Sequence, residues 1–409
     1  MSAEKKMQPT TPEPAASTQP REAQTRLLVI CQGYPPYYGG AERAAAAIAE
    51  QAAASGEYAV SVLTSDIGGR LPAEEQRNGV DVHRIPCPKK NWTRHSVLEL
   101  LAFYRSGRRH MAALEDKLNP QAIIAVFTMP AGLLGAAWSR RYGTPFITVL
   151  QGSDVPGYQP GRFALLHPIM RAVARYVWRR AAHVSAVSSP LADLAKQTLP
   201  SREFGVIPNG VDTRVFHPAT EGDARDDSTI RLITVAQLIE RKGIQHLIEA
   251  IAGMPAGTRA RLQADVYGSG PYESVLREQI DKAGLQGTMT LKGLADEEVL
   301  APELRAADIF VLPTQQEGLP LALMEAMASG LPCLTTPVGD IPQVLQGELA
   351  EMLVPPAQPE ALRAALEALI DAPERRRALG AACRVAAEAY DWASIWSRYA
   401  AHVSAIREN

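Results

Sequence analysis

The sequence is poor in cysteine and has no long apolar run. Its 409 residues include four cysteines that stand far apart, without the spacing of a zinc site or a disulfide framework: Cys31, Cys87, Cys333 and Cys383. No stretch approaches the roughly eighteen consecutive apolar residues of a membrane-spanning helix. These absences predict a soluble protein of the reducing cytoplasm.

The beginning of the chain also lacks apolar residues. Residues 1–25 are rich in Pro, Ser, Thr, Ala and Gln. Such a composition fits neither a signal peptide nor a packed element. We therefore expect a disordered tail over residues 1–25.

The chain has no large excess of one charge, but its two halves differ. It holds 42 Lys and Arg against 44 Asp and Glu, a net charge of −2. Residues 26–200 contain 20 basic and 12 acidic residues, whereas residues 201–409 contain 19 basic and 29 acidic residues. We expect the basic first half to meet something anionic.

Two series of alternating strands and helices predict two domains, because a chain of this length exceeds a single hydrophobic core. Apolar strand candidates occur in the first series at 26–31, 60–64, 122–127, 146–150 and 183–187, and in the second at 231–236, 261–267, 288–291, 308–312 and 333–336. This alternation indicates an α/β fold with two Rossmann-like domains and parallel sheets. Turn residues in IPNGVDTRVFHP place the join near residues 204–218.

The segment FVLPTQQEGLPLALMEAMASGLPCLTTPVGDI is the most informative part of the chain. Glu317 ends a loop after a buried strand, Pro320 fits the first turn of the following helix, and Glu325 lies inside that helix. Ligands of parallel sheets bind beyond the carboxyl ends of the strands. Unpaired amides at a helix start suit a phosphate, and carboxylates accept hydrogen bonds from hydroxyls. The segment therefore predicts a site for a sugar attached to a diphosphate.

Two other loops carry features that suit a phosphate. In GYPPYYGGAER, Gly39 and Gly40 stand before a helix and allow close approach of the backbone, although an ordinary strand–helix turn explains an isolated Gly pair equally well. In VAQLIERKG, Arg241 and Lys242 supply cations that could neutralise a diphosphate, although such pairs are more often solvated.

A third loop, VLQGSDVPGY, follows a buried strand and contains Gln151 and Asp154. From the local residues alone, Asp154 is as consistent with a cap of the loop as with a ligand contact. A fourth loop, YGSGP, is a weaker glycine signal.

Taken together, these segments resemble the family 4 glycosyltransferases over about residues 26–400. The matching segments include PPYYGGAER, LQGSDVPGY, IPNGVDTRVFHP, VAQLIERKGIQHLIEA, YGSGP, LPTQQEGLPLALMEAMASGLP and TPVGDIPQV. The resemblance implies a GT-B fold, with two facing Rossmann-like domains and a deep cleft between them. Residues 26–205 would form the acceptor domain and 206–390 the nucleotide-sugar domain, while 391–409 would form a helix that packs back on the first domain.

The resemblance also implies roles for individual residues. Lys242 and Glu317 would be the catalytic residues, Lys242 binding the diphosphate and Glu317 facing the sugar ring, while Glu325 would bind the ribose hydroxyls. Further donor contacts are implied for Gly40, Gln237, Arg241, Gly293, Gly318, Leu319 and Leu321. Gly39, Gln151 and Asp154 would belong to the loops that meet the sugar and the acceptor.

Three departures from the family pattern accompany these matches. Gln237 stands where an Arg is usual, so Arg241 or a residue of the first domain has to replace one positive charge. Gln151 stands where His is frequent, and Gln can donate a hydrogen bond but cannot titrate. Asp340 and Gln343 stand where Gly and Glu are common.

The resemblance implies a retaining transfer from a nucleotide-diphosphate sugar of the UDP or GDP type. Glu317 would orient the sugar and stabilise positive charge at the ring, and the leaving diphosphate would take the proton of the acceptor. The chain has no Asp-x-Asp motif, only the adjacent Asp226 and Asp227 in a polar linker. We therefore expect no metal and no cofactor.

Basic and aromatic residues occur together in two stretches of the first half. One is HPIMRAVARYVWRR, with Arg171, Arg175, Arg179 and Arg180 beside Tyr176 and Trp178; the other contains Lys89, Lys90, Trp92 and Arg94. Both suit an anionic bilayer or a lipid diphosphate, and a solvated face explains each equally well. With the charge of the first half, they favour a peripheral enzyme at the inner face of the cell membrane. It would act on a lipid-linked or glycan acceptor in surface polysaccharide or glycolipid synthesis, without a nucleic-acid partner.

Other functions remain open from the sequence. A soluble metabolite or a glucan is the main alternative acceptor. A non-catalytic nucleotide-sugar sensor would explain Gln151 and Gln237, but it should have lost Glu317 or Lys242. A glycogen phosphorylase would need a pyridoxal phosphate lysine and a far longer chain.

Overall fold

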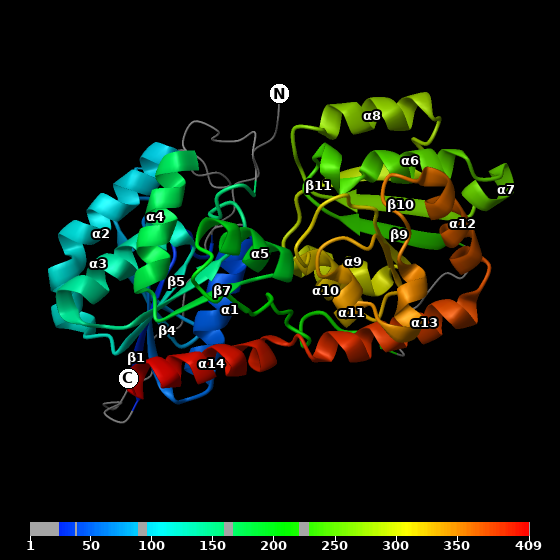
Figure 1. Cartoon of the computed structure of the whole chain (residues 1–409). Helices are drawn as coiled ribbons and strands as arrows, with labels where there is room; N and C mark the ends of the chain where they lie inside the picture. Colours follow the sequence, from blue (N-terminus) through cyan, green and yellow to red (C-terminus); the bar gives the residue numbers. More distant parts are fainter. Residues whose placement is uncertain (1–23, 37–38, 89–95, 159–166, 221–228, 409) are drawn as a thin grey trace.

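The computed structural model describes residues 24–36, 39–88, 96–158, 167–220 and 229–408. These residues form two α/β domains that stand side by side, each with helices on both faces of its sheet (Figure 1). The predicted fold class is confirmed. The predicted tail lies outside the described residues up to position 23, but Thr25 already belongs to the first strand.

The first domain contains an eight-stranded sheet in the order β3-β4-β2-β1-β5-β6-β7-β8. Its strands are β1 (Thr25–Ile30), β2 (Tyr58–Ser65), β3 (Glu74–Arg77), β4 (Val80–Ile85), β5 (Ala122–Val126), β6 (Phe146–Leu150), β7 (His183–Ala186) and β8 (Gly205–Val206). Its helices are α1 (Gly40–Ala54), α2 (Val97–Leu118), the π-helical turn η1 (Thr128–Gly132), α3 (Leu133–Tyr142), α4 (His167–Arg180) and α5 (Ser189–Thr198).

The second domain contains a five-stranded parallel sheet in the order β11-β10-β9-β12-β13. Its strands are β9 (Ile230–Val235), β10 (Leu262–Tyr267), β11 (Met289–Gly293), β12 (Ile309–Leu312) and β13 (Cys333–Thr335). Its helices are the 3-10 turns η3 (Glu240–Lys242) and η4 (Gly347–Met352), together with α6 (Ile244–Ala252), α7 (Ala256–Arg259), α8 (Glu273–Lys282), α9 (Glu297–Ala306), α10 (Leu321–Ala328), α11 (Ile341–Val344), α12 (Pro359–Ile370) and α13 (Pro373–Glu388).

The first sheet is mixed, which corrects the prediction that both sheets are wholly parallel. Strand β3 pairs antiparallel with β4 at one edge. Its sequence, EEQR, is charged and mostly exposed, so it has no apolar pattern that could reveal a strand. Charged residues on an edge strand also discourage pairing with another chain.

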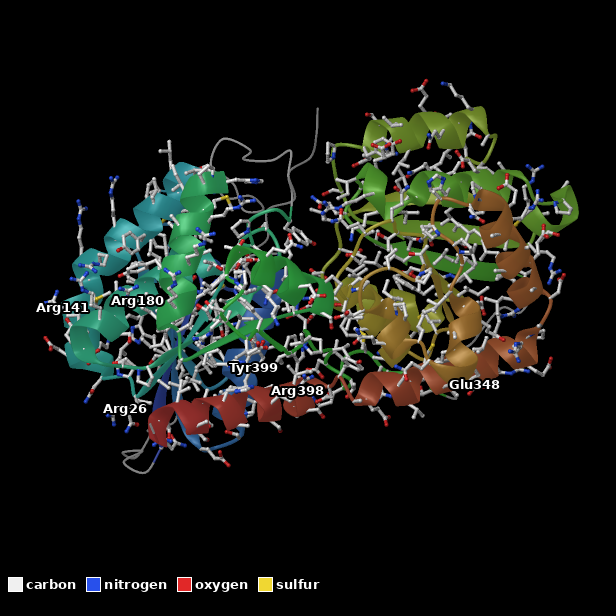
Figure 2. All side chains as sticks on the ribbon, viewed as in Figure 1. Arg26, Arg141, Arg180, Glu348, Arg398 and Tyr399 are labelled. Atoms are coloured by element: carbon white, nitrogen blue, oxygen red, sulfur yellow. The ribbon has the colours of Figure 1, made fainter. Side chains whose placement is uncertain are left out.

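Helix α14 (Trp392–Glu408) returns to the first domain. Its apolar face enters the core between the first sheet and α1, where Ile395, Tyr399 and Val403 are fully or almost fully buried. Figure 1 shows α14 running beneath the first domain, and Figure 2 shows Tyr399 pointing from the helix toward the sheet. Trp396 meets Tyr58 of β2 edge to face, with 5.1 Å between the ring centroids. The last helix therefore fastens the second domain to the first.

The two chain segments that cross between the domains also hydrogen-bond to each other. The Val211 amide donates to the Tyr390 carbonyl at 2.9 Å, and the Trp392 amide donates to the Val211 carbonyl at 3.1 Å. The predicted boundary between residues 205 and 206 falls inside β8, upstream of these contacts.

Asp340, one of the departures from the family pattern, makes a contact between the domains. Its Oδ2 accepts a hydrogen bond of 2.7 Å from the Ser189 amide at the start of α5, where a negative charge is favourable. Gln343 donates to the other oxygen of Asp340 at 3.0 Å. These two residues therefore have a structural role at the domain interface.

Candidate active site

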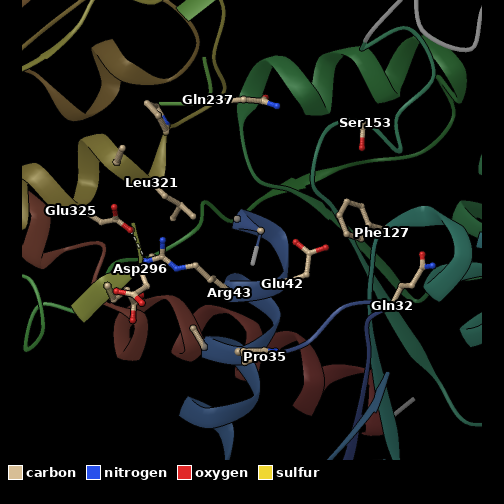
Figure 3. Close-up of a pocket in the computed structure, with 18 of the residues that line it drawn as sticks. Gln32, Pro35, Glu42, Arg43, Phe127, Ser153, Gln237, Asp296, Leu321 and Glu325 are labelled. Carbon is tan, nitrogen blue, oxygen red and sulfur yellow. Dashed lines mark hydrogen bonds and ion pairs between the residues drawn. The ribbon is translucent and has the colours of Figure 1, made fainter. Parts of the chain in front are cut away.

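A cavity of about 1950 Å³ lies between the two domains. Loops from both domains line it: Gln32, Pro35, Phe127 and Ser153 come from the first, and Gln237 and Asp296 from the second (Figure 3). Most of these loops follow strands, at the sheet edges where parallel α/β proteins bind their ligands. The predicted deep cleft is therefore present.

Lys242 and Glu317 form an ion pair at the wall of this cavity. Their side chains are 15% and 11% exposed, so the pair is largely shielded from water. Gly243 directly after the lysine has φ +74, and a Cβ there would lie 1.9 Å from the Pro313 carbonyl oxygen. Glycine thus allows the loop after β9 to pass the end of β12, which brings the two predicted catalytic residues together.

The start of α10 is open toward the cavity at Pro320, Leu321 and Ala322. The structure places Pro320 at the N-cap, one position before the predicted first turn, and it offers no side-chain cap. The first helical hydrogen bonds come from the amides of Leu323 and Met324 to the Pro320 carbonyl. The amides of Leu321 and Ala322 precede these bonds, so they lie where a helix binds an anion.

Glu325 lies one turn further into α10 and is 3% exposed. Its Oε1 accepts a hydrogen bond of 2.6 Å from Arg43 Nη2, and the same nitrogen also contacts Glu297. Figure 3 shows Arg43 extending from α1 to Glu325 across the cavity. Burial disfavours the charge on Arg43, but Glu325 and Glu297 outweigh this effect and raise the pKa of the guanidinium.

The first turn of α1 faces the first turn of α10. A Cβ added to Gly40 would lie 3.5 Å from Leu321 Cδ1, so the two helix starts almost touch. A Cβ on Gly39 would lie only 2.0 Å from an oxygen of Glu42, whose buried carboxylate folds back over this glycine. The two glycines therefore let the first domain approach the predicted phosphate position closely.

Asp154 holds a loop at the first-domain side of the cavity. Its oxygens accept hydrogen bonds from the amide and hydroxyl of Thr128 and from the amides of Gln151 and Gly152, at 2.8 to 3.0 Å. Burial raises the pKa of this carboxyl, and the four donors oppose that effect. Phe127 beside it has φ 79°, a left-handed conformation that costs about 1–2 kcal/mol for a non-glycine residue. Asp154 thus acts as a cap that fixes a strained loop.

The Gln151 side chain turns toward the segment that joins the domains. Its amide pairs with that of Asn209 at 3.3 and 3.5 Å. Gln151 is not among the residues that line the cavity. Its contact with the sugar or acceptor stays a prediction that would require the Asn209 pair to open.

The cavity brings together eight of the residues that the sequence singled out: Gly39, Gly40, Asp154, Gln237, Lys242, Glu317, Leu321 and Glu325. The lining does not include the five others, Gln151, Arg241, Gly293, Gly318 and Leu319. Gly293 is the last residue of β11, and the residues that follow it, Leu294 to Glu298, line the cavity in its place. Gly318 lies against the first domain, where a Cβ would meet Ser188 Oγ at 2.8 Å.

Sequence reasoning missed Arg43 and the apolar part of the lining. Arg43 stands in the segment GGAER, in which only the two glycines suggested a ligand site. Apolar side chains of the first domain line the other side of the cavity, among them Val97, Leu100, Leu101, Met129, Ile169, Met170 and Val173. Ile169 is 62% exposed and Leu101 38% exposed. No motif marked these residues, because apolar residues in helices usually indicate a core.

The basic–aromatic stretch at residues 167–180 forms α4, but one of its predicted membrane contacts is wrong. Trp178 is completely buried, and its indole nitrogen donates to Thr128 Oγ1 at 3.0 Å. Arg180 stacks on Tyr176 at 3.8 Å from the ring centroid and lies on the outer side of the first domain (Figure 2). The cluster at residues 89–94 lies outside the described residues.

Comparison with known proteins agrees with this arrangement. Residues 38–215 match the family model described as Glycosyltransferase Family 4, and residues 221–385 match Glycosyl transferases group 1. Sucrose-phosphate synthase from Thermosynechococcus elongatus superposes with a TM-score of 0.77 at 21% identity, over 93% of this chain and 98% of that chain.

Two relatives are similar in sequence. The MMP alpha-(1->4)-mannosyltransferase of Mycolicibacterium hassiacum is 35% identical over 52% of this chain and 50% of its own length. The Bacillus subtilis protein TuaC, named for teichuronic acid biosynthesis, is 30% identical over 72% of each chain. The matched part therefore spans about half of the first relative and about seven tenths of the second.

The fold and the cleft define a glycosyltransferase of the GT-B architecture. The chain belongs to the family 4 glycosyltransferases. The resemblance seen in the sequence is thereby confirmed.

Proposed function

We propose that this protein is a retaining glycosyltransferase that moves a hexose from a UDP or GDP sugar to an acceptor hydroxyl. The observation that carries the proposal is the convergence of Lys242, Glu317, Glu325 and the start of α10 in one cleft. A cation and a helix N-terminus suit a diphosphate. Two carboxylates, eight residues apart in sequence and both facing the cavity, suit the hydroxyls of a sugar and a ribose.

The groups in the cleft can divide the reaction among them. Lys242 and the amides of Leu321 and Ala322 stabilise the charge that grows on the departing diphosphate. Glu317 orients the sugar and stabilises positive charge at its ring. The bond between the anomeric carbon and the diphosphate oxygen breaks, the acceptor oxygen bonds to the same face of that carbon, and the acceptor proton passes to the diphosphate.

A panel of nucleotide sugars tests this function. We expect slow hydrolysis of one UDP or GDP hexose by the purified protein, accelerated by an acceptor, with NMR showing that the product keeps the anomeric configuration of the donor. Inversion of configuration would contradict the retaining mechanism. Absence of both binding and turnover across the panel would contradict the proposed function.

We further propose that turnover needs no metal ion. The proposal rests on the lack of an Asp-x-Asp motif in the sequence. Across the described ranges there is also no group of three or more His, Cys, Asp or Glu residues that could hold an ion. Activity should therefore survive EDTA. Loss of activity that manganese or magnesium restores would overturn this point.

The acceptor that we propose is lipid-linked, in surface polysaccharide or glycolipid synthesis, and the enzyme would work at the cytoplasmic face of the membrane. Two features support this: the exposed apolar side chains at the cavity, such as Ile169, and the exposed arginines of α4, such as Arg171. Within the described residues, none of the helices is long and apolar enough to cross a bilayer. The membrane contact that we propose is peripheral.

Sedimentation with anionic liposomes tests the membrane contact. Each basic residue near an anionic surface contributes about 1 kcal/mol, so changing Arg171 and Arg179 together to Gln should weaken binding about 10- to 30-fold. A matched control removes two exposed arginines from the second domain, Arg277 and Arg377, and should bind as the parent does. Equal binding by all three proteins would favour a soluble acceptor.

A further inference from the structure

The cavity is short of positive charge for the diphosphate that the proposed function places there. Among the described residues that line it are nine carboxylates and four cations. Two of these cations, Arg77 and Arg214, are exposed, and Arg214 pairs with Asp212. The cations that face the donor loops are Lys242 and Arg43. Gln237, which replaces the usual arginine, is neutral.

Arg43 is built to reach the donor side of the cleft from the opposite domain. It lies in the first turn of α1, where its amide donates to the Gly39 carbonyl at 3.0 Å. Gly40 in the same turn almost touches Leu321. Arg43 therefore stands in a helical turn that lies against the start of α10, the proposed diphosphate position, and its guanidinium contacts Glu325 one turn further along α10.

In the present structure Arg43 is hydrogen-bonded to Glu325, the carboxylate to which we assign the ribose hydroxyls. Arg43 Nη2 hydrogen-bonds to Glu325 Oε1 at 2.6 Å, and Glu325 is almost completely buried, so little room remains for a second donor. A ribose hydroxyl at Glu325 would take over this hydrogen bond. Glu297 on α9 also contacts the guanidinium, is about half exposed, and can hold the cation only loosely in water.

We propose that Arg43 is a further donor-binding residue, which leaves Glu325 when the ribose arrives and turns to the diphosphate. It supplies the positive charge that Gln237 does not. The inference rests on the proposed function, since it needs a nucleoside diphosphate in the cleft. Arg43 then couples donor binding to the contact between the two domains. Its backbone belongs to α1 of the first domain, whereas the diphosphate that it contacts is bound at α10 of the second domain.

Calorimetric titration of the full-length protein with UDP, GDP, uridine and guanosine tests the inference. For the nucleoside diphosphate whose base the parent prefers, Arg43→Gln should lower the affinity about 10- to 100-fold, which is the effect of losing one charge-assisted contact. The nucleoside, which lacks phosphates, should bind Arg43→Gln as tightly as the parent or more tightly, because Glu325 is no longer occupied.

Moving the charge provides the decisive control. In the double variant Arg43→Gln/Gln237→Arg, the second domain carries the cation instead, and the affinity for the diphosphate should return to within about threefold of the parent. Two results would contradict the proposal: Arg43→Gln lowers the affinities for nucleoside and diphosphate equally, or Gln237→Arg does not restore the affinity for the diphosphate. Either result would show that Arg43 only maintains the arrangement of the two domains.

The same titrations separate this inference from the proposed function. A parent that binds neither UDP nor GDP overturns both, whereas a parent that binds a diphosphate as tightly as Arg43→Gln overturns the inference alone. If Arg43→Gln does not fold, Arg43→Lys serves in its place. Arg43→Lys keeps the charge and should retain the preference for diphosphate over nucleoside, and loss of that preference would contradict the role of the charge.

Discussion

The two sides of the cleft differ in the kinds of side chain that line them. On the second-domain side, the cavity is lined by charged groups at defined positions, such as Lys242 and Glu317, which form an ion pair, and Glu325, which lies inside α10. On the first-domain side, α1 carries charged residues such as Arg43, whereas α2 and α4 line the cavity with apolar side chains such as Leu101 and Ile169. The second domain and α1 therefore offer directed charge, and α2 and α4 offer apolar surface.

The difference follows from what each side would bind. A diphosphate needs cations and amides at fixed positions, because hydrogen bonds and ion pairs weaken steeply with geometry. An apolar chain needs only area, because the hydrophobic effect has no direction. The charged side thus leaves a recognisable sequence motif, and the apolar side leaves almost none. Three sets of variants test this division, in order of decreasing expected effect.

The largest effect should come from Lys242→Ala. Lys242 lines the cavity beside Glu317. Arg241 does not line it, and its backbone carbonyl accepts a hydrogen bond from the Gln315 amide at 2.8 Å. Loss of a charge-assisted contact to phosphate should cost about 2–4 kcal/mol of transition-state stabilisation, roughly a 30- to 1000-fold drop in kcat/KM. Arg241→Ala should lose less than about fivefold. Equal, mild losses in steady-state assays of both variants would disprove the assignment.

A smaller and more selective effect should come from the apolar side. Changing Leu101 and Ile169 to Ser should raise the KM for a lipid-linked acceptor about 10- to 30-fold, since each side chain is partly exposed and gains about 1 kcal/mol when covered. Donor hydrolysis without acceptor should not change. Val385→Ser on α13, where Val385 is 69% exposed, is the matched control. A loss that extends to donor hydrolysis would show that the apolar side is not specific to the acceptor.

The smallest effect concerns α14, on which both sides depend for their arrangement. His183 of β7 stacks on His402 of α14, with 3.7 Å between the ring centroids. Burial, with smaller contributions from His402 and Arg202, lowers the pKa of His183 to about 4. The unfolded chain therefore binds the proton first, and the free energy of unfolding should fall between about pH 6.5 and pH 4, by about 1 kcal/mol after allowance for solvent.

Denaturant unfolding at pH 7.5 and pH 5 measures this effect. His183→Phe keeps the ring contact without the titration, so it should flatten the pH dependence relative to the parent. His110→Phe changes an exposed histidine on α2 and should leave the dependence as it is in the parent. Parallel curves for the parent and His183→Phe would assign the acid sensitivity to other groups.

The sequence predicted the second domain and the donor side better than the first domain and the acceptor side. All five strands predicted for the second domain match observed strands to within two residues at each end; β12, for example, was predicted at 308–312 and lies at 309–312, because its residues form a short apolar run. Strand β3 was missed because an exposed edge strand needs no apolar residues. Glu317, Glu325 and Lys242 were predicted through motifs, and the structure brings all three to one cavity.

The contacts between domains could not be predicted from local patterns. Arg43 and Glu325 are separated by 282 positions, and Ser189 and Asp340 by 151. Only the way the two domains face each other makes these residues neighbours. For Trp178 the local pattern gave a wrong prediction. Its four neighbouring arginines suggested a membrane anchor, but Trp178 lies on the face of α4 that packs into the core.

The most direct test of the central claim is a crystal structure of the protein with UDP or GDP, whichever binds more tightly. We expect the diphosphate at the start of α10, with oxygens about 3 Å from Lys242 Nζ and from the Leu321 amide, and the ribose hydroxyls on Glu325. A nucleotide bound elsewhere, with Lys242 still paired to Glu317 and the start of α10 unoccupied, would contradict the account.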